Sequence, residues 1–447
     1  MIKRAFLSMI AVLILVVVIG GAVTLISHHR QKAQLDVAAV EGTQPQITKP
    51  RTALIPLVKI AKPVGWKKGE SPVAAAGLKV QPFATRLDHP RWLLALPNGD
   101  VLVAETSAPP QPNDNVGLKG WIRKKIMSEA GSGDTSPNRI TLLRDTNGDG
   151  IADQRSVLLT GLRSPFGMAL VGDQLYVANT DALLRFPFKP GDTKIAAKGD
   201  KVVDLPAGNI NHHWTKNVIA APDGSKLYVA VGSNSNVGER GQQAEEGRAA
   251  IWEVDPRTRD HRIYAYGIRN PIGLAWEPTS HVLWTVANER DELGSDIVPD
   301  YLTSVQFGGF YGWPWFYWGK YPDNRPKYPP PELVEESSIT PDYALGPHTA
   351  SLGLTFAAGQ ALGPAYADGA FIGQHGSWNR DPPSGYRVVF VKFAKGRPIG
   401  KPIDVLTGFL DGKGHARGRP VGVTIDKGGG LLVADDVGDT IWRVTAG

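Results

Sequence analysis

The chain has 447 residues, a net charge of +6, 42% hydrophobic residues and 21% charged residues, which is the balance of a globular protein. Its 51 glycines and 35 prolines are typical of a chain with many turns, and the lack of cysteine excludes a disulfide framework and thiolate chemistry. The positive charge is spread along the chain rather than gathered in one run, which argues against nucleic acid as a partner.

Residues 1–30 are predicted to form a membrane anchor or a signal peptide. Lys3 and Arg4 precede an apolar run over residues 5–26, and these 22 residues are long enough to cross a bilayer as a helix. A signal peptide usually has a shorter apolar core and a small-residue cleavage site, so an uncleaved anchor is favoured. We therefore expect the rest of the chain on the periplasmic side of the bacterial inner membrane, or exported and soluble if the segment is cleaved.

Residues 31–77 are dotted with proline and lysine and show no strong periodicity. This composition predicts a linker that leads away from the membrane and carries no chemistry. The folded domain is predicted to occupy residues 78–447.

One pattern recurs six times in this domain: a polar or proline-containing lead-in, a short apolar run, a turn, and a strand that ends in alanine or glycine and polar residues. The copies begin at His89, Ser164, Thr215, Asn270, Ala350 and Gly418. Their apolar runs, broken by P-N-G, P-D-G and G-G turns, predict antiparallel strands. Six such units predict an all-β, six-bladed β-propeller, and the alternative of two β-sandwiches does not require six similar lead-ins.

Two insertions interrupt the repeat. Residues 107–139 contain the candidate for a short basic helix, GWIRKKIMSEAG, and residues 307–331 are dense in aromatic side chains. Tyr311 and Trp313 are candidate platforms for stacking on a sugar ring, although aromatic loops more often serve packing.

The lead-ins are predicted to form a ring at one mouth of the propeller channel, because equivalent positions in successive blades lie at equivalent places around the axis. The ring contains no carboxylate. Converging guanidinium groups repel each other unless an anion lies among them, and arginine suits planar carboxylates, although a single arginine here would more often bridge to a neighbouring blade. The set therefore predicts a planar, polyanionic ligand, and its members are Arg91, Arg163, His212, His213, Arg269, Asn270, His348, Thr349, Arg417 and Arg419.

The ordered stretches APDG, YGIRNPIGLAW, GGFYGWP and RGRPVGV resemble the quinoprotein glucose/sorbosone dehydrogenase family, in particular its sorbosone dehydrogenase-like branch. The resemblance extends from about residue 89 to the C-terminus. It implies a six-bladed propeller that holds pyrroloquinoline quinone (PQQ), a planar tricarboxylate, with Ca²⁺ at the channel mouth. This cofactor agrees with the anion that the arginine ring predicts.

The resemblance also implies roles for individual residues. It places the catalytic base at His213 and cofactor contacts at Arg269, Asn270, Thr349, Arg417 and Arg419, with Arg163 as the nearest match to a cofactor-side glutamine. Where soluble glucose dehydrogenases bind calcium through glycine and proline carbonyl groups, this chain reads VANERDELGSD, so the candidate ligands are Asn288, Glu289 and Arg290. A lysine of the family has no obvious equivalent near residues 377–380, so the substrate of the glucose enzymes does not carry over.

These assignments predict oxidation of a sugar, a sorbosone-like aldehyde or another alcohol or aldose. Histidine suits the role of base because its pKa lies near neutrality, so we expect His213 to take the hydroxyl proton while hydride passes to the quinone and Ca²⁺ acts as a Lewis acid. Electrons would then pass to an acceptor such as a quinone or a cytochrome. His212 is expected to support the fold, because adjacent residues on a strand point to opposite faces, and Trp214 to pack between blades.

Three alternatives stay open. The segment DTNGDGIAD, residues 145–153, resembles a calcium loop, but Ser156 stands where the bidentate glutamate would be, and a hairpin turn is favoured. A calcium-dependent propeller lactonase or esterase would need carboxylates and amides at the axis instead of arginines. A membrane-tethered propeller that binds an acidic peptide or glycan is the alternative without catalysis.

Overall fold

The computed structural model describes residues 20–21, 24, 27–53, 56–110, 135–332 and 334–447. Most of the apolar run over residues 5–26 and the basic helix predicted within residues 107–139 lie outside these ranges, so the anchor and that helix stay predictions. Among the described residues, no helix has the length and apolar character needed to cross a membrane.

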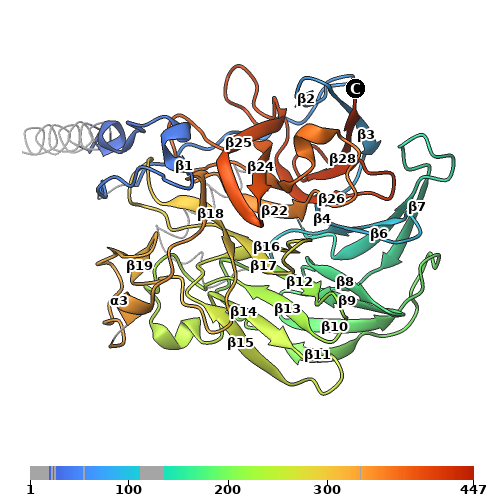
Figure 1. Ribbon diagram of the computed structural model, residues 1–447, viewed down its shortest axis with the longest axis horizontal. Coiled ribbons are helices and arrows are strands. Elements are labelled where there is room, and N and C mark those ends of the chain that lie inside the picture. The colour runs from blue at the N-terminus through green and yellow to red at the C-terminus, as the bar shows by residue number, and fades with distance from the viewer. Residues whose placement is uncertain (1–19, 22–23, 25–26, 54–55, 111–134, 333) are drawn as a thin grey trace, which may run out of the picture.

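Six antiparallel sheets of four or five strands make up the described part of the domain, arranged around an axis (Figure 1). The first three blades are β4 (Pro90–Ala95), β5 (Val101–Glu105), β6 (Arg139–Arg144) and β7 (Gln154–Leu159); β8 (Met168–Val171), β9 (Gln174–Ala178), β10 (Ala182–Pro187) and β11 (Asp200–Asp204); and β12 (Lys216–Ala220), β13 (Leu227–Val231), β14 (Ala250–Val254) and β15 (His261–Tyr266).

The other three blades incorporate strands from before the repeat. They are β16 (Pro271–Trp276), β17 (Leu283–Ala287), β18 (Pro299–Ser304), β21 (Tyr343–Pro347) and β1 (Glu41–Gly42); β22 (Ser351–Phe356), β23 (Gly369–Gln374), β24 (Arg387–Ala394), β25 (Arg397–Thr407) and β2 (Val73–Ala74); and β26 (Pro420–Ile425), β27 (Leu431–Asp435), β28 (Thr440–Ala446) and β3 (Leu78–Ala84). Short elements are β19 (Phe316–Tyr317), β20 (Tyr321–Pro322), α3 (Val334–Ser337) and the 3-10 turns η1 (Val37–Val40), η3 (Gln242–Glu245) and η4 (Pro364–Tyr366).

The innermost strands form a closed ring in the order β4, β8, β12, β16, β22 and β26, and β26 lies against β4. The last blade joins both ends of the domain, because β3 pairs with β28. Each repeat found in the sequence begins one blade, so the predicted six-bladed propeller is confirmed and the pair of sandwiches is excluded.

Apolar side chains fill the spaces between blades. Trp214 is buried in a cluster with Trp92 and Phe166, and its ring meets the Phe166 ring edge-on at 6.2 Å between centroids, which confirms the predicted packing role. The P-N-G turn between β4 and β5 works as expected, since Gly99 takes a φ of 102° that other residues avoid.

The described part of residues 31–77 packs on the propeller, which corrects the prediction of a linker. In Figure 1 the blue segment runs from β1, beside β25, to β2 and β3. β1 pairs with β21 and β2 pairs with β25, so the segment supplies the outer strand of two blades. Trp66 donates a hydrogen bond from Nε1 to Asp435 Oδ2 at 2.7 Å, and Arg51 forms an ion pair with Asp296.

The turn over residues 145–153 connects β6 and β7, which pair as a hairpin. The Asp145 carboxylate accepts hydrogen bonds from the backbone N–H groups of Gly148 and Gly150, both at 2.8 Å. The favoured interpretation of a hairpin turn is therefore confirmed.

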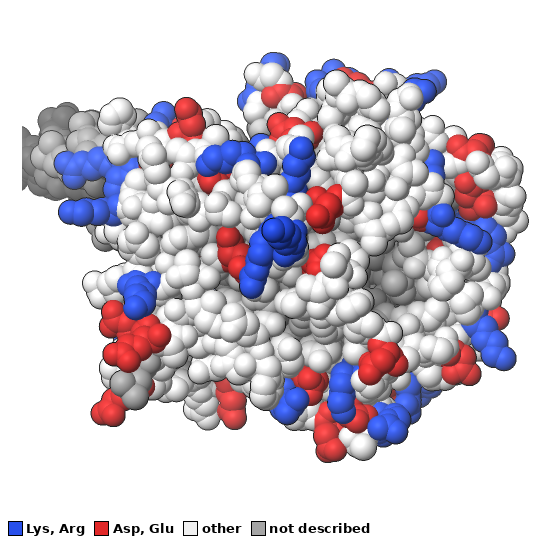
Figure 2. All heavy atoms as spheres, in the orientation of Figure 1, with Lys and Arg blue, Asp and Glu red and all other residues white. Residues whose placement is uncertain are grey.

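Charged side chains of both signs are scattered over the face shown in Figure 2.

Replacing Trp66 by Phe should lower the free energy of unfolding by about 1.5–3 kcal/mol, the scale of a hydrogen bond to a charged group. Phenylalanine keeps an aromatic ring against Phe409 and Trp442 but cannot donate to Asp435. Urea unfolding at pH 7.5 measures the change, because burial raises the pKa of Asp435 to about 6 and the carboxylate is charged above that value.

Trp378→Phe is the matched control, since Trp378 is 39% exposed and its replacement should change stability by less than about 0.5 kcal/mol. Equal unfolding midpoints for the two variants would mean that the Trp66 contact does not stabilise the propeller.

Candidate functional site

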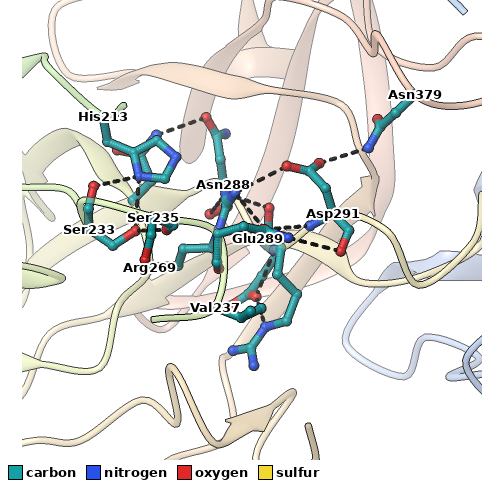
Figure 3. A network of polar contacts seen from close by, with 12 residues as sticks. His213, Ser233, Ser235, Val237, Arg269, Asn288, Glu289, Asp291 and Asn379 are labelled. Carbon is teal, nitrogen blue, oxygen red and sulfur yellow. Dashed lines mark hydrogen bonds and ion pairs between the residues drawn. The ribbon is translucent and has the colours of Figure 1, made fainter. Parts of the chain in front are cut away.

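His213 lies at the start of the third blade, just before β12. Its Nδ1 is 2.8 Å from the Ser233 carbonyl oxygen and 2.9 Å from Ser233 Oγ (Figure 3). A carbonyl oxygen only accepts hydrogen bonds, so Nδ1 carries the proton and Nε2 keeps a lone pair. Among the described residues, Nε2 has no hydrogen-bond partner, and it is the atom that can take a proton.

The electrostatics around His213 favour the neutral imidazole. Burial and the positive charge of Arg269 lower its pKa well below the ordinary value of 6.5. The buried Lys216 fixes the backbone at His213, because its Nζ donates to the His213 carbonyl oxygen at 3.2 Å. Gly232 adds a second constraint, because a Cβ there would lie 2.5 Å from His213 Cβ, closer than real carbon atoms approach.

Arg269 is the centre of a hydrogen-bond network that joins the third and fourth blades (Figure 3). Its guanidinium donates to the Asn236 backbone oxygen at 3.1 Å, to Asn236 Oδ1 at 2.9 Å, to the Glu289 carbonyl at 2.7 Å and to Asp291 Oδ2 at 3.1 Å. Asn270, the next residue, is 6% exposed, and its Oδ1 has no partner among the described residues.

The three candidate calcium ligands do not converge. Glu289 Oε2 accepts from Arg290 Nε at 2.9 Å, and the completely buried Arg290 guanidinium also donates to the carbonyl groups of Pro314 and Phe316. The Asn288 side chain donates to the Ser351 carbonyl oxygen at 2.8 Å. Because these side chains hold other parts of the fold and the Glu289 carbonyl faces a guanidinium, they do not fit a calcium site.

Thr349 lies against a buried carboxylate. Its Oγ1 donates to Asp300 Oδ2 at 3.1 Å, and burial raises the pKa of Asp300 to about 6. Nearby, His348 Nδ1 is 3.6 Å from Asp291 Oδ1. Burial alone would raise the pKa of Asp291, but His348 and Arg269 together lower it to about 2.

A second charged cluster, the Asp436 cluster, lies where the first, fifth and sixth blades meet. Arg91 Nη1 donates to Asp436 Oδ2 at 2.7 Å, and His375 Nε2 lies 3.0 Å from the same oxygen. Burial lowers the pKa of His375 to about 4, although Asp436 opposes the change. Burial and the charge of Arg419 lower the pKa of Arg91, which Asp436 raises, so the two guanidinium groups sense each other.

Two arginines of the predicted ring lie apart from these clusters. The Arg163 side chain is 64% exposed and pairs with Asp181 at 2.6 Å, and the Arg417 side chain is 33% exposed and lies 3.8 Å from Glu70. Arg91, by contrast, bridges to a neighbouring blade, as expected of a single arginine.

The two candidate sugar platforms are buried in this structure. Tyr311 donates to the Ser304 carbonyl at 2.6 Å, and Trp313 Nε1 donates to the Asn236 carbonyl at 3.0 Å. Both side chains have an exposure of 4% or less, so these two rings of the aromatic insertion pack inward against the third and fourth blades rather than facing solvent.

The lead-in pattern does not include the carboxylates of the site or His375. Asp291, Asp300, His375 and Asp436 do not stand in the lead-ins; His375 and Asp436 follow the second strand of a blade, and Asp291 follows it at a short distance. Antiparallel pairing places the end of that strand opposite the start of the first, as with Pro420 and Asp435. The sequence signal for these site residues was therefore the polar residue that follows the second strand of a repeat.

The site can bind an anion and move a proton. Arg91 and Arg419 each have a buried Nε without a partner among the described residues, and such donors are satisfied by the oxygens of a carboxylate ligand. These two donors fit an acidic cofactor, and the unpaired Oδ1 of Asn270 and Nε2 of His213 add acceptors on the same ring of inner strands.

Comparison with known proteins places this arrangement in a family. A model of the family described as TrAA12-like matches residues 136–300 and 332–447. An uncharacterized protein of Borreliella burgdorferi is 28% identical over 63% of this chain and 76% of its own length. A pyrroloquinoline quinone-dependent pyranose dehydrogenase of Coprinopsis cinerea is 24% identical over 63% of this chain, and the match spans 45% of that protein.

Solved structures share the fold. The family AA12 enzyme of Trichoderma reesei superposes with a TM-score of 0.68 at 18% identity, covering 87% of this chain and 99% of that one. The holo PQQ domain of the Coprinopsis cinerea pyranose dehydrogenase gives 0.65 at 19% identity, covering 86% and 100%. These comparisons support the predicted relationship to quinoprotein sugar dehydrogenases and do not single out the sorbosone branch. Because the family model matches more than half of its length, the chain belongs to the TrAA12-like family.

Proposed function

We propose that this protein is a PQQ-dependent dehydrogenase that oxidises a sugar, a sorbosone-like aldehyde or a related alcohol and passes the electrons to a separate acceptor such as a quinone or a cytochrome. One observation carries the proposal: a neutral imidazole whose Nε2 has no partner among the described residues lies in the same channel mouth as two buried arginines, Arg91 and Arg419, whose Nε atoms have none either. The relatives named as PQQ-dependent dehydrogenases support it.

The residues that would hold the cofactor are Arg91, Arg419, Arg269, Asn270 and Thr349. The free Nε atoms of Arg91 and Arg419 would donate to its carboxylates, and the Asn270 amide, whose Nδ2 donates to Asn288 Oδ1, would contribute its unpaired Oδ1 as an acceptor. Arg91 was predicted only as a member of the arginine ring and becomes a proposed cofactor contact. Arg163 and Arg417 lie farther from the two buried clusters and do not. PQQ, when bound, supplies the electrophile that accepts hydride.

The protein's own part in the reaction is to orient the substrate hydroxyl and remove its proton. His213 Nε2 accepts this proton, because Nδ1 is held as a donor to the Ser233 carbonyl. The imidazolium that forms lies near the Asp291 carboxylate, whose charge favours the protonated ring. Arg269 holds Asp291 in place, so the countercharge is present before the proton arrives.

Calcium has no step in this scheme, since Asn288, Glu289 and Arg290 do not form a site for it. The N-terminal anchor and the periplasmic location also remain proposals, supported by the apolar run over residues 5–26. We place the propeller outside the cytoplasm on that ground.

Replacing His213 by Gln should lower the turnover of dye reduction by about 10²–10⁴-fold, the usual contribution of a positioned base. Glutamine keeps a hydrogen-bonding side chain but cannot take a proton at neutral pH. Quinone binding, followed by absorbance titration, should change little. The assay uses protein loaded with PQQ and screens aldoses, sorbosone and simple alcohols.

His212→Gln is the matched control, because His212 is the neighbouring, partly buried histidine. Full activity of the His213 variant would remove the base from the proposal. Chelator-sensitive lactone hydrolysis without any response to quinone would favour the lactonase, and retained binding of an acidic partner without dye reduction would favour the binding module.

The rate should stay high as the pH falls through 6.5. Burial and Arg269 lower the pKa of His213, so the neutral base persists below the ordinary value of 6.5 and activity is lost only at lower pH. The profile of kcat/KM against pH measures this acid limb. Arg269→Met should move the limb to higher pH, whereas an acid limb centred above 6.5 in the unmodified protein would contradict the proposed environment of the base.

Replacing Arg419 by Met should weaken PQQ binding by about tenfold to hundredfold, the range for a hydrogen bond to a charged group. Methionine keeps most of the apolar contact with Tyr386 but has no donor for the cofactor. Arg257→Met is the control, since the Arg257 side chain is 84% exposed. Equal affinities for the two variants would show that Arg419 does not touch the cofactor.

A further inference from the structure

A cavity of about 550 Å³, widely open to solvent, lies in loops of the third blade that are close to His213 in the chain. Its lining comes from residues 206–210, which precede β12, from Asn234, which follows β13, and from residues 243–248, which precede β14. The volume lies within the range of about 300–1,000 Å³ that is usual for small-molecule sites. None of the contacts ascribed above to the reacting group or the cofactor uses it.

Two chain segments tie this cavity to the candidate base. Ile210 lines it three residues before His213, and Asn234 lines it directly after Ser233, whose carbonyl accepts the Nδ1 proton. His213 does not itself line the cavity, but both segments place the cavity close to it. A ligand that reacts at Nε2 would have this space available for the rest of its structure.

The lining suits a neutral ligand with many hydroxyl groups. Asn209, Gln243 and Asn234 contribute amides, which both donate and accept hydrogen bonds. The charges of Arg248 and Glu246 oppose each other, so the lining favours neither an anion nor a cation.

Two of the lining residues are buried and differ in how they are satisfied. The Arg248 guanidinium is 7% exposed and already donates to Asn211 Oδ1 at 2.9 Å and to the Ala207 carbonyl at 2.6 Å, so it is part of a built wall. Asn234 is 6% exposed, and its Oδ1 has no partner among the described residues. A buried acceptor of this kind is costly unless a ligand or water pairs with it, and a ligand hydroxyl group in the cavity would do so.

We propose that the cavity is an accessory subsite for a neutral carbohydrate residue, and that the substrate is a disaccharide or longer glycan whose terminal sugar reacts at His213. This inference rests on the proposed function for the place where the terminal sugar reacts. The subsite would then determine how long a substrate can be, through the space between the third blade and the loop over residues 206–210.

Binding is tested first, without turnover, on the His213→Gln protein. Titration calorimetry compares cellobiose, maltose and lactose with glucose and galactose. At least one disaccharide should bind about tenfold more tightly than its monosaccharides, which corresponds to one or two ordinary hydrogen bonds. Ala244→Trp, which fills the cavity from η3, should abolish that advantage, while Ala197→Trp on an exposed loop should preserve it.

The amide is tested by Asn234→Leu, a substitution of similar size that cannot form hydrogen bonds. It should reduce kcat/KM for the favoured disaccharide by about tenfold and leave kcat/KM for the monosaccharide within about twofold. Asn179→Leu is the matched control, because Asn179 is equally buried with an unpaired Oδ1 but does not line the cavity.

The subsite and the proposed function fail in different ways. Equal affinity for every disaccharide and its monosaccharides, or an unchanged preference in the Ala244→Trp protein, would overturn the subsite even if dye reduction is observed. Tighter disaccharide binding that Ala244→Trp removes would support the subsite even if no sugar reduced the dye, and that outcome would overturn only the dehydrogenase.

Discussion

Buried positive charge at the channel mouth is the constraint on which the rest of the site depends. Closing six inner strands into a ring brings Arg91 and Arg419 within each other's electrostatic reach, and Arg269 lies in a buried position at the fourth blade. Guanidinium groups in a low-dielectric interior are costly unless they are paired. Asp436 and Asp291 pair with two of them, and the free Nε atoms of Arg91 and Arg419 leave donors for a further anion.

The sequence predicted the fold more fully than the site. Six similar lead-ins and turns with P-N-G, P-D-G and G-G were enough for the propeller, because each repeat supplies the inner strands of one sheet and pairing among those strands is local. The lead-ins also contain His213, Arg269 and Arg419, which belong to the proposed site, but they describe only the first strand of each blade. Asp436 and His375 each follow the second strand of a blade. The predicted ring seemed free of carboxylates, but in the structure Asp436 lies among its arginines.

Other differences come from tertiary contacts, which the repeat pattern does not encode. Arg163 and Arg417 occupy lead-in positions, yet each turns toward an acidic neighbour, Asp181 or Glu70. The segment over residues 31–77 has the composition of a linker, but β1 and β2 add edge strands and Arg419 Nη2 donates to the Ala61 carbonyl at 3.1 Å. This segment therefore helps to position the guanidinium that the proposed cofactor would meet.

The same charges set the properties of the candidate base. Arg269 favours a neutral His213, which leaves Nε2 ready to accept a proton but makes the imidazole a weak base. Asp291 compensates for this, because its pKa of about 2 keeps it ionised while its charge stabilises the imidazolium. Arg269 binds Asp291 directly, and the Asn379 Nδ2 donor at 2.8 Å holds the carboxylate from the other side. In the proposed mechanism, one arginine thus keeps the base unprotonated before the reaction and holds the countercharge that the protonated ring would need.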